Sequence, residues 1–331
     1  MKAIVLNDKN ELTDQEVQIR SISENEILIR IMASAFNPID YQMRESEQER
    51  KYLFSPILGR ELSGIVEKTG SAVTDFRIGD EVFCACGSMG SNGSYATHIL
   101  VPQEIAVRKP RSISFEQAAA LPVVGITALQ VLNRISIRPD TRILVTGASS
   151  GVGNFFIKLL LAKGIKYLTV TAGNKNKTEQ LRKIGLQEEQ IVDYHSPDLS
   201  SELIRRNGGI KFDIVVDCVG EYLSEISAAV MKANAVYADI TNRISSEGRA
   251  QLFDIGATIH HISNFVYARE KRYTYFRQSL EQIRRYIDET QVTPPAITVI
   301  GGLSAENAEY AQHVLQNNGT SGSKLIMQNQ I

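Results

Sequence analysis

A glycine-rich run near the middle of the chain reads Thr146-Gly147-Ala148-Ser149-Ser150-Gly151-Val152-Gly153. An apolar, β-branched run, Ile143–Thr146, leads into it, and a run with helical spacing, Val152–Lys163, follows it. A glycine-rich turn in this position is typical of a turn that binds the phosphates of a dinucleotide. Gly151 allows the backbone to approach a pyrophosphate, Gly153 allows the helix to pack closely on the strand, and the helix N-terminus offers N–H groups to an anion. The alternative is a tight strand-to-helix connection with no ligand.

Downstream of this turn, strand and helix patterns alternate along the chain. Apolar runs recur as candidate strands, separated by runs with helical spacing. The predicted strands are Ile143–Thr146, Tyr167–Thr171, Gln190–Asp193, Phe212–Asp217, Ala235–Ile240 and Thr258–Phe265, and the predicted helices are Val152–Lys163, Lys177–Ile184, Leu199–Arg206 and Leu223–Lys232. The alternation predicts βαβ units, and so a parallel sheet with helices on both faces.

The rest of the chain has a different pattern of apolar runs and turn residues. Before about residue 120, turn signals recur about every 8–12 residues between short apolar runs, which is typical of a small β-barrel or sandwich. The predicted strands there are Val17–Ile22, Glu26–Ala33, Gly59–Glu67, Asp80–Ala85 and Gly93–Val101. Two helices, Phe115–Leu121 and Thr127–Arg134, lead into the alternating region, and the chain ends with a helix at Tyr273–Thr290, a strand at Ala296–Val299, a helix at Ala305–Gln316 and a strand at Lys324–Met327.

Length and composition limit the class of protein. With 331 residues the chain is expected to form about two domains. A net charge of −1, with Lys and Arg spread along the chain, disfavours nucleic acid and anionic membranes as partners. Three cysteines are too few for a disulfide framework and indicate a reducing compartment. The N-terminus turns polar too soon for a signal peptide, and no apolar run approaches the roughly 20 residues of a membrane helix, so we expect a cytoplasmic protein.

The residues after the second strand of the alternating region indicate which dinucleotide is bound. A site for NAD usually places Asp or Glu about 20 residues beyond the glycine turn, where it holds the ribose hydroxyls. Here Asn174 lies 21 positions after Gly153, and no carboxylate appears until Glu179. Lys175 and Lys177 would attract a 2′-phosphate. The sequence therefore favours NADPH; the alternative is that the lysines only solvate the start of a helix.

Several motifs together resemble a known family. In chain order they are Asn37-Pro38-Ile39-Asp40, Gly59-Arg60-Glu61-Leu62-Ser63-Gly64, Gly79-Asp80-Glu81-Val82, Gly93-Ser94-Tyr95-Ala96, Ala119-Ala120-Leu121-Pro122, Asp213–Gly220 and Ser321–Ile326. The whole chain resembles the medium-chain dehydrogenase/reductase superfamily, and within it the zinc-free quinone oxidoreductase branch. The resemblance implies an α/β protein with a GroES-like β-barrel catalytic domain, residues 1–122 and 267–331, around a Rossmann NADP-binding domain with a doubly wound parallel sheet, residues 123–266.

The same motifs argue against a metal. Zinc members of the family carry a Cys and a His as ligands in the early motifs, where this chain has Asn37 and Arg60. A guanidinium cannot ligate zinc. Cys84 and Cys86 form the only early cysteine pair, lack the other ligands of a structural zinc lobe, and are expected to be ordinary buried cysteines. We therefore expect no metal ligands.

Without a metal, hydrogen-bond donors must polarise the substrate, and the cofactor supplies hydride. Quinones and activated alkenes (enones) suit such a site, because the charge develops on an oxygen that an amide or phenol can stabilise. By resemblance the candidate catalytic residues are Asn37, Tyr41 and Tyr52. Each also has a structural interpretation: Asn37 as a turn cap beside Pro38, Tyr41 as packing of a helical turn, and Tyr52 as a packed loop residue.

Further contacts with NADPH follow from the turn and from the resemblance. Tyr194 follows the third strand of the alternating region, Asn264–Val266 matches the segment beside the nicotinamide, and Thr127 opens the helix under it. The full candidate set is Thr127, Ala148, Ser149, Ser150, Gly151, Val152, Gly153, Gly173, Asn174, Lys177, Tyr194, Val219, Asn264, Phe265, Val266 and Lys324.

Two departures from the family pattern and two rival interpretations stand beside this one. Ser150 occupies a position where the branch often has glycine, and Lys232–Tyr237 lacks the glycine that usually precedes the fifth strand. The turn and the pair Tyr267 and Lys271 also match a short-chain carbonyl reductase, but about 140 residues precede the turn here. The other rival is a non-catalytic NADPH-binding regulator. The predicted strand Thr258–Phe265 would lie at the edge of the parallel sheet. An exposed edge strand with apolar residues needs to be covered, and pairing with a second copy of the chain would cover it, which predicts a homodimer.

Overall fold

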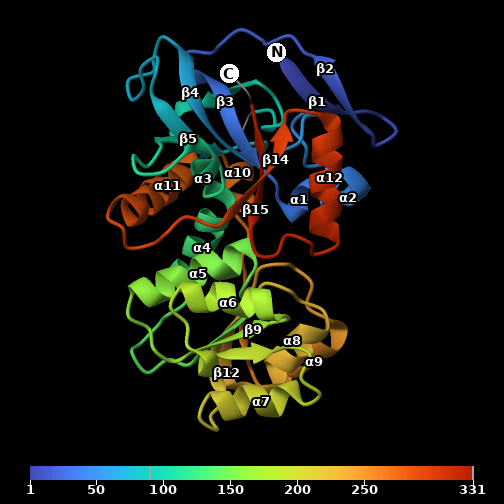
Figure 1. Cartoon of the computed structure of the whole chain (residues 1–331), viewed down its shortest axis with the longest axis vertical. Helices are drawn as coiled ribbons and strands as arrows, with labels where there is room; N and C mark the ends of the chain where they lie inside the picture. Colours follow the sequence, from blue (N-terminus) through green and yellow to red (C-terminus); the bar gives the residue numbers. More distant parts are fainter. Residues whose placement is uncertain (89–90, 330–331) are drawn as a thin grey trace. The chain divides into compact units, whose positions relative to one another are not determined.

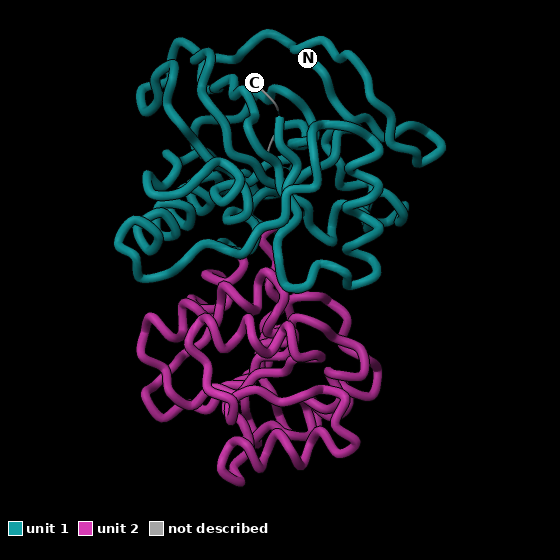
Figure 2. Tube along the Cα trace, viewed as in Figure 1, with its two compact units in different colours: residues 1–126, 265–331 teal, residues 127–264 magenta. Residues whose placement is uncertain are grey.

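The computed structural model describes residues 1–88 and 91–329. The chain divides into two compact units (Figure 2). Unit 1 contains residues 1–126 and 265–331, and unit 2 contains residues 127–264. The sequence placed the corresponding boundaries at 122/123 and 266/267, a few residues away.

Unit 2 is built on a six-stranded parallel sheet with the order β10-β9-β8-β11-β12-β13. Figure 1 shows helices on both sides of this sheet, α5 and α6 on one side and α7 on the other. Its strands are β8 (Ile143–Thr146), β9 (Leu168–Ala172), β10 (Ile191–Asp193), β11 (Phe212–Asp217), β12 (Met231–Asp239) and β13 (Thr258–His261). Its helices are α5 (Gly151–Ala162), α6 (Lys175–Lys183), η2 (Glu188–Gln190), α7 (Leu199–Arg206), α8 (Tyr222–Ala229) and α9 (Ser246–Asp254), together with the part of α4 (Pro122–Arg134) that follows residue 126. The predicted doubly wound sheet is confirmed.

Burial explains why this sheet forms. β8 and β9 are buried along their whole length, as expected for central strands covered on both faces. The side chains of Val215, Tyr237 and Leu252 join one apolar cluster that packs helices α7, α8 and α9 on the sheet. The segment Lys232–Tyr237 lacks the glycine expected before the fifth strand, and Asn234 within it adopts a left-handed conformation (φ 58°). Asparagine is one of the few other residues that adopts this conformation readily, so the missing glycine does not interrupt the strand.

Unit 1 is a mostly antiparallel β structure. Its seven-stranded sheet has the order β14-β15-β3-β4-β5-β7, with β6 also paired to β3, and β1 and β2 form a separate hairpin. The strands are β1 (Lys2–Leu6), β2 (Leu12–Glu16), β3 (Glu26–Ala35), β4 (Glu61–Thr69), β5 (Glu81–Ala85), β6 (His98–Pro102), β7 (Ala106–Arg108), β14 (Ile297–Gly302) and β15 (Lys324–Gln328). The helices are α1 (Pro38–Glu45), α2 (Glu47–Arg50), η1 (Gln103–Ile105), α3 (Phe115–Ala119), the start of α4, α10 (Phe265–Arg269), α11 (Tyr273–Asp288) and α12 (Ala305–Gln316).

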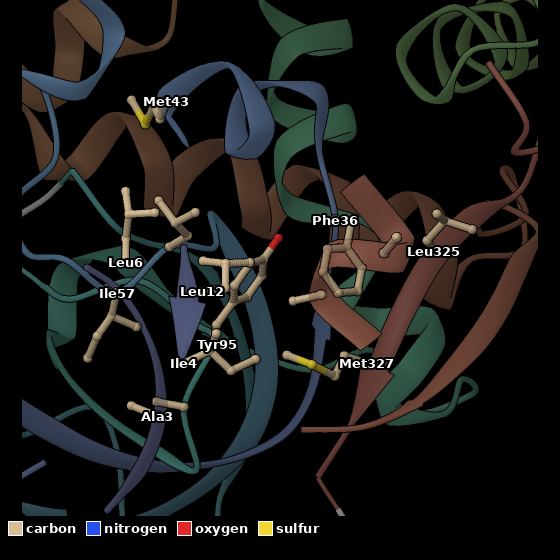
Figure 3. Packing of buried hydrophobic residues seen from close by; sticks show 14 residues of the cluster. Ala3, Ile4, Leu6, Leu12, Phe36, Met43, Ile57, Tyr95, Leu325 and Met327 are labelled. Atoms are coloured by element: carbon tan, nitrogen blue, oxygen red, sulfur yellow. The ribbon is translucent and has the colours of Figure 1, made fainter. Parts of the chain in front are cut away.

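The core of unit 1 joins residues from both ends of the chain. Figure 3 shows Ile4, Phe36 and Tyr95 packed with Leu325 and Met327, which come from the C-terminal strand β15. The rings of Phe36 and Tyr95 lie 5.0 Å apart, centroid to centroid. β15 lies between β14, to which it is parallel, and β3, to which it is antiparallel. The last strand therefore completes the sheet that the first third of the chain begins.

One predicted strand is absent, and three other predicted elements have different bounds. Val17–Ile22 is not a strand; it has no strand partner in the described chain, and its apolar side chains are only half-buried. β13 stops at His261, because the following residues leave the sheet to contact α4, where Gln130 Nε2 donates to the Ser263 carbonyl at 3.0 Å. The helix predicted to reach Lys232 ends at Ala229, since Met231 already pairs with β11. The strand predicted from Gly93 begins only at His98.

Across the part of the chain that the structure describes, no helix combines the length and apolar character needed to cross a membrane.

Candidate active site

The glycine turn, residues 146–153, joins β8 to α5 in unit 2. Gly147 has φ 62°, a left-handed conformation that favours glycine, and a Cβ there would lie 2.8 Å from Cγ2 of Val219. A Cβ on Gly153 would lie 2.6 Å from the Gly147 carbonyl oxygen. The absence of a side chain at Gly147 thus leaves room for Val219, and its absence at Gly153 lets the start of α5 pack closely against the end of β8. These close approaches require glycine at both positions.

Ser150 is the N-cap of α5, which explains why serine fits here. Its hydroxyl oxygen accepts the Gly153 N–H at 3.1 Å, and its carbonyl accepts the Asn154 N–H at 2.8 Å. The N–H groups of Gly151 and Val152 precede the first intrahelical bond and lie at the positive end of the helix dipole. Ala148 is buried and Ser149 is half-buried beside them. The turn can therefore hold an anionic group with backbone N–H groups, as a pyrophosphate requires.

The end of β9 brings together the residues expected to discriminate between nucleotides. A Cβ on Gly173 would lie 2.4 Å from ring atoms of Tyr194, so the tyrosine ring covers this glycine. Asn174 caps α6, and its side-chain oxygen accepts the Lys177 N–H at 2.9 Å. Asn174 is exposed and Lys177 is half-buried. Gly173, Asn174, Lys177 and Tyr194 thus form one group, as the sequence suggested.

Two other candidate cofactor contacts meet within unit 2. Asn264 Nδ2 donates to the Thr127 hydroxyl at 2.9 Å, which ties the segment after β13 to helix α4. Phe265 and Val266 follow directly in α10, in unit 1. There the ring of Phe265 packs on Tyr52, with centroids 4.7 Å apart.

In unit 1 three candidate or motif residues form a buried hydrogen-bonded network. Asn37 Nδ2 donates to Glu61 at 2.9 Å, and the Lys324 ammonium lies 2.7 Å from the same carboxylate. The ammonium also donates to Asn37 Oδ1. The other Glu61 oxygen accepts the Val123 N–H at 2.7 Å. Because the Glu61 side chain is fully buried, these donors replace the water that would otherwise solvate its charge.

Asp40 and Arg60 add a second pair of charges to this region. The Asn37 N–H donates to the Asp40 carboxylate at 2.8 Å, at the start of α1. Burial raises the pKa of Asp40 to about 6, although the Asn37 N–H and the Arg60 charge both act to lower it. Burial also lowers the pKa of Arg60, which contacts the sulfur of Met43. Asn37, Asp40, Arg60, Glu61 and Lys324 are called the buried network below.

The candidate catalytic residues are not equally placed. Asn37 is 3% exposed, and both ends of its amide are engaged inside the buried network. Tyr41 lies half-buried on α1. Tyr52 follows α2, is 40% exposed, and has the Lys51 ammonium 5.0 Å from its ring centre. Sequence reasoning gave Lys324 a contact with the cofactor, and this stays a prediction; the structure places its ammonium on Glu61 and Asn37.

Sequence reasoning missed the roles of Asp40 and Glu61. Both belong to motifs that it used only to detect the resemblance, and charged residues beside glycine and proline turns were the available signal. No pattern in the sequence could show that Lys324, 287 positions from Asn37, reaches the same place. Cys84 and Cys86 are both buried, and burial raises the pKa of each thiol. Among the described residues, no group of three or more His, Cys, Asp or Glu side chains is arranged to hold a metal ion.

The Alcohol dehydrogenase GroES-like domain family matches residues 23–111, and the Zinc-binding dehydrogenase family matches residues 151–282. Together the two matches cover more than half of the chain, in the order of the two units. Chloroplast envelope quinone oxidoreductase homolog of Arabidopsis thaliana is 29% identical over 68% of this chain and 69% of its own length.

The chain belongs to the medium-chain dehydrogenase/reductase superfamily, in its quinone oxidoreductase branch.

Other members of this superfamily resemble the chain to a similar degree. The mitochondrial NAD(P)H oxidoreductase RTN4IP1 of Dictyostelium discoideum is 32% identical over 66% of this chain and 64% of its own length. Escherichia coli quinone oxidoreductase complexed with NADPH is 26% identical, with a TM-score of 0.81 and 98% of each chain covered. An alcohol dehydrogenase superfamily protein from Novosphingobium aromaticivorans reaches a TM-score of 0.88 at 23% identity over both whole chains, which shows the medium-chain fold alone.

Membership of the superfamily decides two earlier questions. The expected fold, a GroES-like unit with a Rossmann-like parallel sheet, is confirmed. The short-chain interpretation is excluded, and its Tyr267 instead stacks on Tyr275 with ring centroids 3.7 Å apart. Lys271 adopts a left-handed conformation (φ 53°) beyond the end of α10. The relatives support an oxidoreductase that uses a nicotinamide cofactor.

Proposed function

We propose that this chain is an NADPH-dependent oxidoreductase that transfers hydride to a quinone or to an activated alkene (enone) without zinc. The observation that carries the proposal is the buried network. At the two positions where zinc members have Cys and His ligands, it holds the amide of Asn37 and the guanidinium of Arg60. A guanidinium has no lone pair to offer a metal, and it brings a positive charge of its own.

The glycine turn fits the phosphates of NADPH. Gly147 and Gly153 leave no room for side chains, and the helix start supplies N–H groups. Gly173, Asn174, Lys177 and Tyr194 would hold the adenosine 2′-phosphate. This assignment is supported by the absence of a carboxylate between Gly153 and Glu179 and by the positive charge of Lys177, which would attract the dianion.

When bound, NADPH supplies the hydride. The remaining chemistry falls to side chains that stabilise negative charge on the acceptor oxygen and deliver a proton. Glu61 and Lys324 fix the plane of the Asn37 amide, so that its second N–H has one defined direction. The Tyr52 phenol, packed by Phe265 yet exposed, is placed to donate a hydrogen bond or a proton to an acceptor.

The test is NADPH consumption with a panel of quinones and enones, followed by absorbance. We expect turnover with at least one acceptor class, a lower kcat for Tyr52→Phe, and no stoichiometric zinc by metal analysis. Tyr310→Phe, at an exposed tyrosine on α12, is the control and is expected to leave kcat unchanged. Stoichiometric zinc, or turnover with NADH as fast as with NADPH, would contradict the corresponding part of the proposal.

A second candidate is a non-catalytic NADPH-binding regulator. The observation that favours it is the engagement of both ends of the Asn37 amide by the buried network at 3% exposure. Tight NADPH binding without turnover on every acceptor of the panel would select this candidate over the enzyme.

Two further parts of the proposal concern the state of the protein. We propose a homodimer through the edge strand β13, which has no neighbour on one side in the six-stranded sheet. Sedimentation velocity on the wild type and on a β13 variant, Ile259→Lys, tests it. The expected cytoplasmic location stays a prediction, since several relatives are named as chloroplast or mitochondrial proteins.

A further inference from the structure

A row of polar residues crosses the carboxyl edge of the sheet in unit 2. Thr146, Asp217, Asp239 and His261 are register partners on β8, β11, β12 and β13, and each is the last residue of its strand. We call these four residues the polar row. Residues at paired positions of neighbouring parallel strands point to the same face, so the row is continuous. In open α/β sheets, dinucleotides bind across this edge.

Asp217 shows what a carboxylate does in this row. Its side chain is fully buried and accepts the Val219 N–H at 2.9 Å and the Gly220 N–H at 3.0 Å, which folds the loop that follows its own strand. The hydroxyls of Thr146 and Tyr237 also donate to it. Val219 in turn packs at Gly147 of the glycine turn. Asp217 therefore shapes a loop that carries a candidate cofactor contact.

Asp239 repeats this arrangement one strand further along. It is 3% exposed, and it accepts the Thr241 N–H at 3.2 Å and the Asn242 N–H at 2.8 Å, again the second and third residues after the carboxylate. Its other oxygen lies 2.9 Å from Nδ1 of His261. Because a carboxylate only accepts, Nδ1 carries the proton in this bond. The His261 imidazole takes the place that the hydroxyl groups of Thr146 and Tyr237 take at Asp217.

The backbone that follows His261 is held from the opposite side by helix α4. Three α4 residues with helical spacing reach it. Arg134 donates a hydrogen bond to the His261 carbonyl, and Gln130 donates one to the Ser263 carbonyl. The Thr127 hydroxyl accepts a hydrogen bond from the Asn264 side chain. Residues 261–264 are thus held on one side by α4 and on the other by the bond between Asp239 and His261.

We propose that Asp239 and His261 are positioning residues for the nicotinamide end of the bound cofactor. Their hydrogen bond holds loop 240–242 and residues 262–264 in the conformation that binds the nicotinamide end of the cofactor. This inference rests on the proposed function, because it takes NADPH as the ligand and Asn264 as a residue beside the nicotinamide. Neither Asp239 nor His261 touches the reacting atoms in this proposal.

Affinity measurements with two probes test the inference on the full-length protein. The probes are NADPH and 2′-phospho-ADP-ribose, which lacks the nicotinamide. For His261→Ala we expect the Kd of NADPH to rise about fivefold to tenfold, the net effect of losing one ordinary hydrogen bond, with the Kd of 2′-phospho-ADP-ribose unchanged. His261→Asn, whose side-chain NH₂ group replaces Nδ1–H, is expected to restore most of the NADPH affinity.

His260→Ala is the matched control, because His260 is the same residue type on the opposite face of β13, beside Arg134. It is expected to leave both Kd values unchanged. The molar mass of each variant is measured as well, since β13 is an edge strand. If the wild type binds neither probe, the proposed function fails. If the wild type binds both and His261→Ala changes neither Kd, or both equally, the positioning role is wrong.

Discussion

The glycine turn of unit 2 is made of backbone, whereas the buried network of unit 1 is made of charged side chains. The turn depends on the absence of Cβ atoms at Gly147 and Gly153, within one continuous stretch of chain. The network depends on Glu61 meeting Asn37 and Lys324 from distant parts of the sequence. A change in the turn should therefore act first on cofactor binding, and a change in the network first on stability.

The largest effect is expected from breaking the buried ion pair. Lys324→Met leaves the fully buried Glu61 carboxylate without its cation, and should lower the free energy of unfolding by about 3–5 kcal/mol. Chemical denaturation measures it. Adding Glu61→Gln should recover part of the loss, and Lys68→Met, an exposed lysine of unit 1, is the matched control. A loss below about 1 kcal/mol would show that the pair is solvated.

The next effect depends on pH and concerns Asp40. Its pKa is about 6 in the folded chain against 3.8 for the free group, because it is buried. Between these values the unfolded chain has released the proton that the folded chain retains, so the wild type loses stability as pH rises through this window. Asp40→Asn removes this dependence. Its stability relative to the wild type should therefore rise between about pH 4 and pH 6, by at most about 3 kcal/mol, and then stay level.

Thermal or chemical unfolding of the wild type and of Asp40→Asn across that pH range measures the difference in their free energies of unfolding. Carboxylates whose pKa is lowered, such as Glu26, act in the opposite direction but equally in both proteins, so they cancel in the difference. Parallel stability curves for the wild type and Asp40→Asn would show that Asp40 titrates like an exposed group.

In the turn, Gly153→Ala tests the close approach. The new Cβ would lie 2.6 Å from the Gly147 carbonyl, and its displacement should cost about 2 kcal/mol and weaken NADPH binding at the same time. Gly164→Ala is the matched control: its left-handed backbone costs about 1 kcal/mol, but the site has open space around it, so NADPH binding should not change. If Gly153→Ala binds NADPH as tightly as the wild type, the glycine turn does not bind the cofactor.

The smallest effect should come from Lys177. Lys177→Ala removes one half-buried charge and should weaken NADPH binding about fivefold, or about 1 kcal/mol, while NADH binding stays the same. Lys183→Ala, at the exposed end of the same helix, is expected to change neither. Isothermal titration with both dinucleotides measures these affinities. An equal loss of NADH affinity would show that Lys177 stabilises helix α6 and does not bind the 2′-phosphate.

The same contrast explains what the sequence could predict. The turn was predictable because its requirements are local: a β-branched strand, glycines at fixed positions and a helix start. The strands of unit 2 followed for the same reason, since buried parallel strands are continuous apolar runs. The partners of Asn37 were not predictable, because tertiary contact alone brings Lys324 to it. The polar row was missed since register, which the sequence does not display, aligns Asp239 with His261.

The insertion of β15 between β14 and β3 has a consequence for synthesis on the ribosome. Residues 127–264 form one continuous unit, so all of unit 2 emerges before the final strand exists. Until residues 324–328 follow, the end of β3, Ala33–Ala35, lacks its partner strand and Glu61 lacks the Lys324 ammonium. Since domains generally fold as units during translation, unit 2 should reach its native state first on the nascent chain. Until then unit 1 has an unpaired stretch at the end of β3, the kind of surface that chaperones cover.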